Sequence, residues 1–199
     1  MKKIAITGNI GSGKTTISNI LIKEGYEVFQ CDKEISKLYL SSDLKEDIKM
    51  AFNNKVQNLF FRNGKVNKKS LSDYVFSSPP SLKKLEKIVY FYLEITKKKF
   101  LKKNKKKRFV FFDIPLLFEK KKEDNYNYII YLTLNKENQK HRVLKRKNIN
   151  EFKLKKILRN QKDYSKSKKI SLLLDTNKDK KEVKRNIISF IMRINAPCF

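Results

Sequence analysis

The sequence predicts an α/β fold with a parallel β-sheet flanked by helices. Short apolar segments alternate along the chain with longer segments of helical periodicity, which is the pattern of such folds. Residues 109–114 form an almost continuous apolar run, typical of a central strand that is buried on both faces. A glycine-rich motif directly follows the first apolar segment. The chain of 199 residues fits one domain with small inserted subdomains.

The glycine-rich motif at residues 8–16 lies between a predicted strand at 3–7 and an amphipathic helix. A strand, Gly-x-x-x-x-Gly-Lys-Thr and a helix form the context of a phosphate-binding loop, whose backbone N–H groups hold phosphates. The alternative is a glycine-rich turn that only joins strand to helix. The residues expected to bind a nucleoside triphosphate are Gly8, Gly11, Ser12, Gly13, Lys14, Thr15 and Thr16. Lys14 is expected to reach the β- and γ-phosphates, and the Thr15 hydroxyl to bind Mg²⁺.

The remaining elements follow from periodicity, turn residues and capping signals. Further strands are expected at 26–31, 108–114, 128–132 and 171–174, and helices at 33–52, 68–76, 81–102, 135–145, 150–161 and 181–193. Ligands of parallel sheets bind at the carboxyl ends of the strands. The glycine-rich motif, Asp32, Asp113 and residues 115–119 are therefore expected to share one site.

Two aspartates at predicted strand ends are candidates for the chemistry of phosphoryl transfer. Asp113 closes the apolar strand, where a carboxylate can hold Mg²⁺ directly or through water, although a polar residue can also simply end a strand. Asp32 could accept a proton from an acceptor hydroxyl or position it in line with the γ-phosphate. On position alone, an exposed turn aspartate is an equally good interpretation of Asp32.

The composition is strongly basic, with 48 Lys and Arg against 20 Asp and Glu and a net charge of +28. Basic surfaces bind nucleic-acid backbones, but here lysine is spread over nearly every predicted helix instead of gathering on one face. Asn, Ile and Phe are also frequent, and they share A- and T-rich codons with lysine. Our hypothesis is that compositional bias produced much of the charge, and a source genome of balanced base composition would contradict it. No specific nucleic-acid partner is expected.

The compartment is predicted from features that the sequence lacks. No apolar run approaches the length of a membrane span, and the motif begins too near the N-terminus to leave room for a signal peptide. Cys31 and Cys198 are far apart and indicate neither a disulfide framework nor a zinc site. We expect a cytoplasmic protein without a membrane partner, and no feature of the sequence sets its oligomeric state.

These motifs together resemble the dephospho-CoA kinase family. The resemblance rests on the glycine-rich motif, on Asp32 after the second strand and on Asp-Ile-Pro-Leu-Leu-Phe-Glu at residues 113–119. Further matches are Val75-Phe76, Leu85-Glu86, Gln139, Arg142, Arg146 and Gln161. The resemblance implies transfer of the γ-phosphoryl group of ATP to the 3′-hydroxyl of dephospho-CoA, the last step of coenzyme A synthesis.

The resemblance also implies an architecture. It is a P-loop kinase core at about 1–60, 108–140 and 171–199, with a helical acceptor-binding subdomain inserted at about 61–107 and a lid at about 141–170. The implied partners are the small-molecule substrates ATP and dephospho-CoA, and the implied cofactors are ATP and Mg²⁺.

The resemblance assigns roles residue by residue. Asp32, Lys14 and Arg142 would be catalytic, with Asp32 as the base that activates the acceptor hydroxyl. Arg142 and Arg146 would lie at the lid and bind ATP, where guanidinium groups neutralise the transferring phosphoryl group. Ordinary exposed basic residues on a lysine-rich helix are the alternative for both arginines. The implied acceptor-binding residues are Asp32, Pro115, Leu116, Leu117, Phe118 and Glu119, and the implied metal ligands are Thr15 and Asp113.

The chain departs from the family pattern, and two other functions stay open. Tyr90-Phe91 stands where the family usually has His-Pro, and Lys147-Asn148 follows Arg146 where the family typically has Asp. Another small-molecule P-loop kinase, such as a nucleoside monophosphate kinase, shares the loop and the lid arginines but is not expected to carry the 113–119 motif. A basic nucleic-acid-binding P-loop NTPase would show aromatic residues within one coherent basic face and salt-dependent binding.

Overall fold

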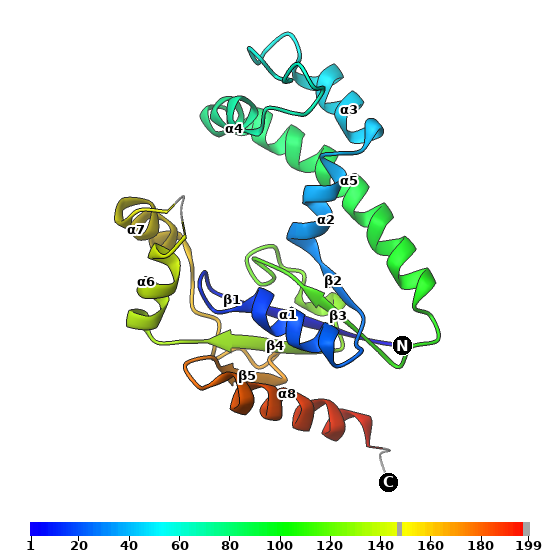
Figure 1. Cartoon of the computed structure of the whole chain (residues 1–199), viewed down its shortest axis with the longest axis vertical. Helices are drawn as coiled ribbons and strands as arrows, with labels where there is room; N and C mark the ends of the chain where they lie inside the picture. Colours follow the sequence, from blue (N-terminus) through cyan, green and yellow to red (C-terminus); the bar gives the residue numbers. More distant parts are fainter. Residues whose placement is uncertain (147–148, 197–199) are drawn as a thin grey trace. The chain divides into compact units, whose positions relative to one another are not determined.

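The computed structural model describes residues 1–146 and 149–196, which form two compact units (Figure 1). Unit 1 contains Met1–Gln30 and the chain from Lys106 onward, and unit 2 contains Cys31–Lys105. Lys147, Asn148 and Cys198, which were discussed from the sequence, lie outside the described residues.

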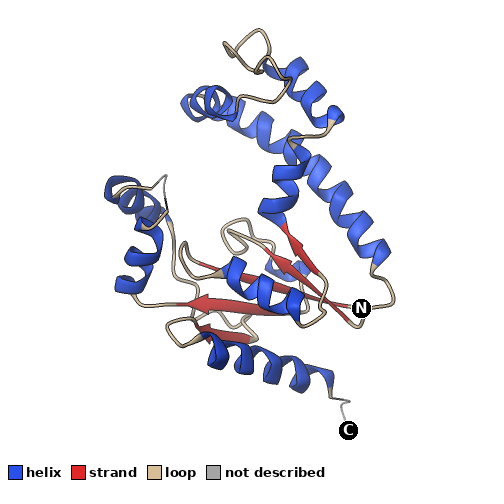
Figure 2. Cartoon of the chain, in the orientation of Figure 1, coloured by secondary structure: helices blue, strands red, loops and turns tan. Residues whose placement is uncertain are grey.

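Unit 1 is built on a parallel β-sheet (Figure 2). Within the described residues the sheet has five strands in the order β2-β3-β1-β4-β5, and every neighbouring pair is parallel. The strands are β1 (Lys2–Gly8), β2 (Val28–Gln30), β3 (Phe109–Asp113), β4 (Tyr128–Thr133) and β5 (Leu172–Asp175). Successive side chains of a strand face opposite sides of the sheet, and Ile4, Ala5 and Ile6 of β1 are all fully buried. The predicted α/β fold with a parallel sheet is confirmed.

Unit 1 also contains helices, and two of them cover the sheet and complete its core. The helices of this unit are α1 (Lys14–Lys23), the short 3₁₀ helix η1 (Glu123–Asn125), α6 (Lys136–Leu144), α7 (Glu151–Asn160) and α8 (Lys180–Asn195). Ile17 and Leu21 of α1 and Ile187 and Phe190 of α8 belong to one buried cluster with residues of β1, β3 and β4. The two helices therefore bury their apolar stripes against the same core, which fixes α1 and the loop before it.

Unit 2 is helical and has a core of its own. Its helices are α2 (Cys31–Leu38), α3 (Ser42–Phe52), α4 (Lys68–Ser77) and α5 (Pro79–Lys103). Leu44 and Ile48 of α3 pack with Leu71 of α4 and Val89 of α5, and all four side chains are buried. Because α3 shares this core, the helical unit begins earlier than residue 61, where the sequence placed its boundary.

Two elements differ from the sequence-based prediction. The second strand ends at Gln30, so Asp32 lies in the first turn of α2 instead of closing a strand. The helix predicted at 33–52 is broken into α2 and α3. Ser41 accounts for the break, because its backbone N–H and its hydroxyl both donate to the Leu38 carbonyl, at 2.9 and 2.7 Å. It stands directly before α3 with an extended backbone, but its side chain makes no capping hydrogen bond to that helix.

Helix α5 is the longest helix of unit 2, with 25 residues, and its last turns are rich in lysine. Among the residues that the structure describes, neither α5 nor any other helix is long and apolar enough to cross a membrane.

Candidate active site

The phosphate-binding loop connects the end of β1 to the start of α1. Gly8 ends β1, and Gly13 precedes α1 with a left-handed φ of 87°. A Cβ atom on Gly8 would lie 2.5 Å from the Leu132 carbonyl oxygen, and one on Gly11 would lie 2.8 Å from Val143 Cγ2. Side chains do not fit at these two positions, because the loop backbone lies directly against β4 and α6. The predicted order of strand, loop and helix is confirmed.

Lys14 and Ser12 lie against the loop backbone. Lys14 Nζ donates hydrogen bonds to the Gly8 carbonyl at 2.6 Å and to the Asn9 carbonyl at 3.5 Å. Ser12 is fully buried, and in the described part of the chain its Oγ has no hydrogen-bond partner. A buried hydroxyl without a partner is rare in proteins and costs free energy. Both side chains therefore suit a loop that receives an anionic group with acceptor oxygens.

The N-terminus of α1 adds positive potential to the loop. Its first turn contains no acidic residue, and Thr15 and Thr16 are exposed there. The first N–H groups of a helix have no carbonyl partner within the helix, so they are available to a ligand. The helix dipole also favours negative charge at this end. The Thr15 hydroxyl is open to a metal ion or to a phosphate oxygen.

Asp113 lies beside α1 at the carboxyl end of β3. It is half-buried, and its Oδ2 accepts a hydrogen bond from Ser18 Oγ at 3.0 Å. In the sheet Asp113 is paired with Ile6 of β1 and Gln30 of β2, so it stands at the same edge as the phosphate-binding loop. Ser18 was not singled out from the sequence, although its place one turn after Lys14 puts it on the helix that faces β3.

Residues 115–119 form a tight segment after β3. Leu117 and Phe118 are buried, and the Phe118 ring stacks on Tyr164 with 4.9 Å between ring centroids. Leu116 has a left-handed φ of 57° and is 41% exposed, while Glu119 is half-buried. A γ-branched residue in this conformation is strained, which is common where a segment must present its backbone or side chains in one geometry. Leu117 and Phe118 anchor the segment, and its other side chains reach solvent.

Arg142 of α6 reaches the chain between β5 and α8. Its Nη1 donates to Thr176 Oγ1 at 3.2 Å, and its Nη2 donates to the Thr176 carbonyl at 2.6 Å. A Cβ atom on Gly13 would lie 3.8 Å from Arg142 Nη1, so this guanidinium also lies next to the loop. Arg146 is exposed beyond the end of α6, and His141 is exposed on α6. The structure brings Arg142 to the loop and leaves Arg146 at the surface.

A pocket of about 220 Å³ opens beside the loop and α1. Its walls combine apolar side chains of α1 and α8 with three cationic side chains. It is lined by Gly13, Thr16, Ile17, Ile20, Arg142, Thr176, Lys178, Lys180 and Val183. Thr176, Lys178 and Lys180 were missed by sequence reasoning. Their position directly after β5 could have identified them, because the carboxyl ends of parallel strands meet at the ligand-binding edge of the sheet.

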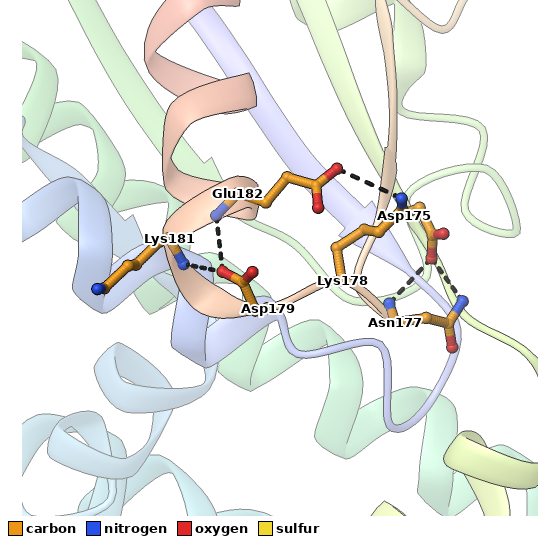
Figure 3. Close-up of polar contacts among 6 residues, drawn as sticks. All are labelled: Asp175, Asn177, Lys178, Asp179, Lys181 and Glu182. Atoms are coloured by element: carbon orange, nitrogen blue, oxygen red, sulfur yellow. Dashed lines mark hydrogen bonds and ion pairs between the residues drawn. The ribbon is translucent and has the colours of Figure 1, made fainter.

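The chain between β5 and α8 is held by two aspartates (Figure 3). One carboxylate oxygen of Asp175 accepts the backbone N–H of Asn177 at 2.9 Å and also the side-chain amide of Asn177. Asp179 Oδ1 accepts the backbone N–H groups of Lys181 and Glu182 at 2.7 and 2.9 Å. These two hydrogen bonds cap α8 and lower the pKa of Asp179. The wall of the pocket formed by this segment is therefore fixed by local hydrogen bonds.

Asp32 belongs to unit 2, where it occupies the first turn of α2. Its backbone carbonyl accepts a hydrogen bond from Ser36 Oγ at 2.8 Å, and the residue is exposed. The carboxylate is therefore accessible to a small molecule. In residues 1–146 and 149–196, no group of three or more His, Cys, Asp or Glu side chains is arranged to hold a metal ion.

A parallel sheet with a phosphate-binding loop after its first strand, and with a cationic pocket beside that loop, is the architecture of the P-loop proteins, which include the P-loop kinases. A family model described as dephospho-CoA kinase matches residues 2–182. The chain is also 32% identical to the dephospho-CoA kinase of Bartonella quintana (strain Toulouse) over 194 residues, which cover 96% of this chain and 97% of the relative. The chain therefore belongs to the dephospho-CoA kinase family, and the family predicted from the sequence is confirmed.

Solved structures agree with this fold. TT1252 from Thermus thermophilus is 27% identical, with a TM-score of 0.84 and coverage of 98% of both chains. The dephospho-CoA kinase from Campylobacter jejuni is 20% identical, with a TM-score of 0.68 over 97% of both chains, and this likeness concerns the fold alone. The chain is thus an enzyme of the kinase class that uses ATP.

Proposed function

We propose that this chain transfers the γ-phosphoryl group of ATP to the 3′-hydroxyl of dephospho-CoA, giving coenzyme A and ADP. Membership of the dephospho-CoA kinase family supports the acceptor. The observation that carries the proposal is the phosphate-binding loop, with Lys14 Nζ bonded to its carbonyls and the Ser12 hydroxyl buried with no partner among the described residues. Such a loop holds the phosphates of a nucleoside triphosphate.

ATP would lie along the loop and enter the adjoining pocket. The N–H groups of residues 11–14 would bind the phosphates, with Lys14 exchanging the Gly8 carbonyl for the β- and γ-phosphate oxygens. The pocket of about 220 Å³ combines apolar walls from α1 and α8 with the planar guanidinium of Arg142, which suits a purine ring. Arg142, which lies next to Gly13 of the loop, and Arg146 would neutralise charge on the transferring phosphoryl group.

Mg²⁺ would be held by few protein groups. Thr15 supplies an exposed hydroxyl, and Asp113 supplies a carboxylate whose Oδ2 is oriented by Ser18. Mg²⁺ usually keeps several waters and is bound through one or two protein groups and the substrate phosphates, so this donor set fits the ion. The ion would neutralise charge on the β- and γ-phosphates.

The acceptor side of the reaction rests on Asp32 and on residues 115–119. Asp32 would take the proton of the 3′-hydroxyl while that oxygen forms a bond to the γ-phosphorus and the bond from phosphorus to ADP breaks. Pro115, Leu116 and Glu119, anchored by Leu117 and Phe118, would contact dephospho-CoA. The helical subdomain at about 61–107 would bind the rest of the acceptor, and residues 141–170 would act as a lid. We further propose that the reaction takes place in the cytoplasm.

The test is ADP release from Mg-ATP with dephospho-CoA, compared with AMP, dTMP, CMP and single-stranded DNA. We expect ADP only with dephospho-CoA, matched by an equal amount of coenzyme A. ADP formed with a nucleoside monophosphate would move the enzyme to another kinase class. Stimulation by DNA alone would mean that the charge of +28 is the functional signal.

Two variants test the assigned roles. Lys14→Ala is expected to lose most phosphoryl transfer, with Lys23→Ala at the exposed end of α1 as its control. Asp32→Asn is expected to spare ATP binding but to lower kcat by about 100-fold or more, the usual contribution of a general base. Asp73→Asn, an exposed aspartate of α4, is the matched control. Normal turnover of Asp32→Asn would disprove the base assignment.

A further inference from the structure

The tip of the phosphate-binding loop is held by side chains from outside the loop. The backbone carbonyl of Ile10 accepts a hydrogen bond from Gln139 Nε2 at 2.9 Å, and the backbone N–H of Ile10 donates to Gln161 Oε1 at 3.0 Å. One residue of the loop is therefore bound on both of its polar backbone groups, one by each glutamine. Gln139 belongs to α6 and is buried, and Gln161 follows α7 directly.

Neighbouring contacts fix the same part of the loop. Tyr131 Oη donates to Asn9 Oδ1 at 3.3 Å and accepts the backbone N–H of Tyr164 at 3.3 Å. Burial, the largest cause, raises the pKa of Tyr131, so this phenol keeps its proton for the donation. The loop is thus tied both to α6 and to the chain after α7.

We propose that Gln139 and Gln161 are positioning residues that form a clamp on Ile10. The clamp fixes the loop conformation in which the N–H groups of residues 11–14 converge on phosphate. It also fixes both ends of residues 140–160, the segment that carries Arg142 and Arg146. The inference rests on the proposed function only in taking ATP as the nucleotide.

The polarity of the clamp makes it testable. The Ile10 carbonyl can only accept, so Gln139 must donate, and the Ile10 N–H can only donate, so Gln161 must accept. A glutamate at 161 keeps the acceptor, whereas an ionised glutamate at 139 places a carboxylate against a carbonyl oxygen. The glutamates introduced at positions 139 and 161 would both lie against the backbone of Ile10, so they should repel the nucleotide phosphates to a similar extent. The difference in nucleotide affinity between the two variants then reports the hydrogen bond.

The first experiment measures ADP binding by calorimetry. Gln139→Met and Gln161→Met, which keep the side-chain length, are expected to weaken ADP binding about tenfold, the equilibrium effect of one lost hydrogen bond. Gln139→Glu is expected to bind ADP at least about tenfold more weakly than Gln161→Glu. The control is Gln57→Met, at an exposed position of unit 2. Unchanged binding in both Met variants, or equal effects of the two Glu variants, would overturn the clamp.

The second experiment follows hydrogen exchange at the Ile10 amide by NMR. Among the described residues only Gln161 accepts from this amide, so Gln161→Met is expected to speed its exchange about tenfold, and Gln139→Met to change it little. An unchanged exchange rate in Gln161→Met would refute the inference even if the variant bound ADP weakly. Neither experiment uses an acceptor. A wild-type enzyme that binds ADP through the clamp but does not phosphorylate dephospho-CoA would therefore overturn the proposed function alone.

Discussion

The close fit of Gly8 against the neighbouring strand gives a graded prediction for alanine substitutions. Gly8 has a φ of 147° and Gly25, in the same unit, has a φ of 81°, so both have conformations that disfavour a side chain. They differ in their surroundings. A Cβ atom on Gly8 would lie 2.5 Å from the Leu132 carbonyl oxygen, whereas one on Gly25 meets no atom within 4 Å.

The two costs follow from these contacts. Gly25→Ala should lower the free energy of unfolding by about 1 kcal/mol, the left-handed penalty less the entropy that alanine removes from the unfolded chain. Gly8→Ala carries a similar backbone cost and brings a carbon about 0.8 Å closer to an oxygen than the usual contact of about 3.3 Å. Relief requires β1 and β4 to separate where Gly8 is paired with Leu132. Overpacking of this kind costs about 1–3 kcal/mol, so with the backbone cost of about 1 kcal/mol the total is about 2–4 kcal/mol.

Urea unfolding followed by circular dichroism measures this difference. A loss of about 2–4 kcal/mol is a large part of the total stability of a typical domain, about 5–15 kcal/mol. Gly8→Ala should therefore also weaken ADP binding, because the first turn of the loop would be displaced. Equal losses of stability in Gly8→Ala and Gly25→Ala would show that the loop does not lie against β4 as described.

Three further predictions concern single polar contacts. Arg142→Lys cannot reproduce both hydrogen bonds to the segment before α8 and should raise the KM for ATP about tenfold with little change in the KM for dephospho-CoA, as measured by initial rates. Ser18→Ala removes the donor to Asp113 and should lower the free energy of unfolding by about 1 kcal/mol and raise the Mg²⁺ concentration needed for half-maximal activity. The hydrogen bond from Tyr92 to Asp47, followed by desolvation, raises the pKa of Tyr92 from 10.0 to about 12. The stabilisation from this protonated phenol is complete below pH 10 and is lost as the pH rises through 12, and a tyrosinate titration of Tyr92→Phe should lack this late component.

The sequence predicted those elements whose signal is local. Strands β3 and β4 are buried on both faces, so their apolar runs are continuous and were recognised to within a residue or two. The break between α2 and α3 was missed because residues 31–52 contain no glycine or proline to mark the end of a helix. Ser41 carried the signal for this break, as serine is favoured where a helix begins.

The site was predictable where one segment supplies the chemistry and less so where two segments must meet. Glycine spacing and Lys14 identified the loop by themselves. Thr176 pairs with Arg142 across 34 residues of sequence, and that meeting depends on β4 and β5 being neighbours in the sheet. Local periodicity shows that a strand exists but not which strand lies beside it.

The choice of residue type at positions 139 and 161 has a physical reason that only the structure reveals. The backbone of Ile10 offers one acceptor and one donor, and an amide is a neutral side chain that can serve either. A lysine at 161 could not accept, and a carboxylate at 139 could not donate, while a carboxylate at either position would oppose the triphosphate. In a chain with 48 Lys and Arg residues, two neutral glutamines supply the donor and the acceptor that this loop residue needs. The basic composition gives no indication of this pair, and the glutamines are explained by the donor and acceptor groups of the Ile10 backbone that they contact.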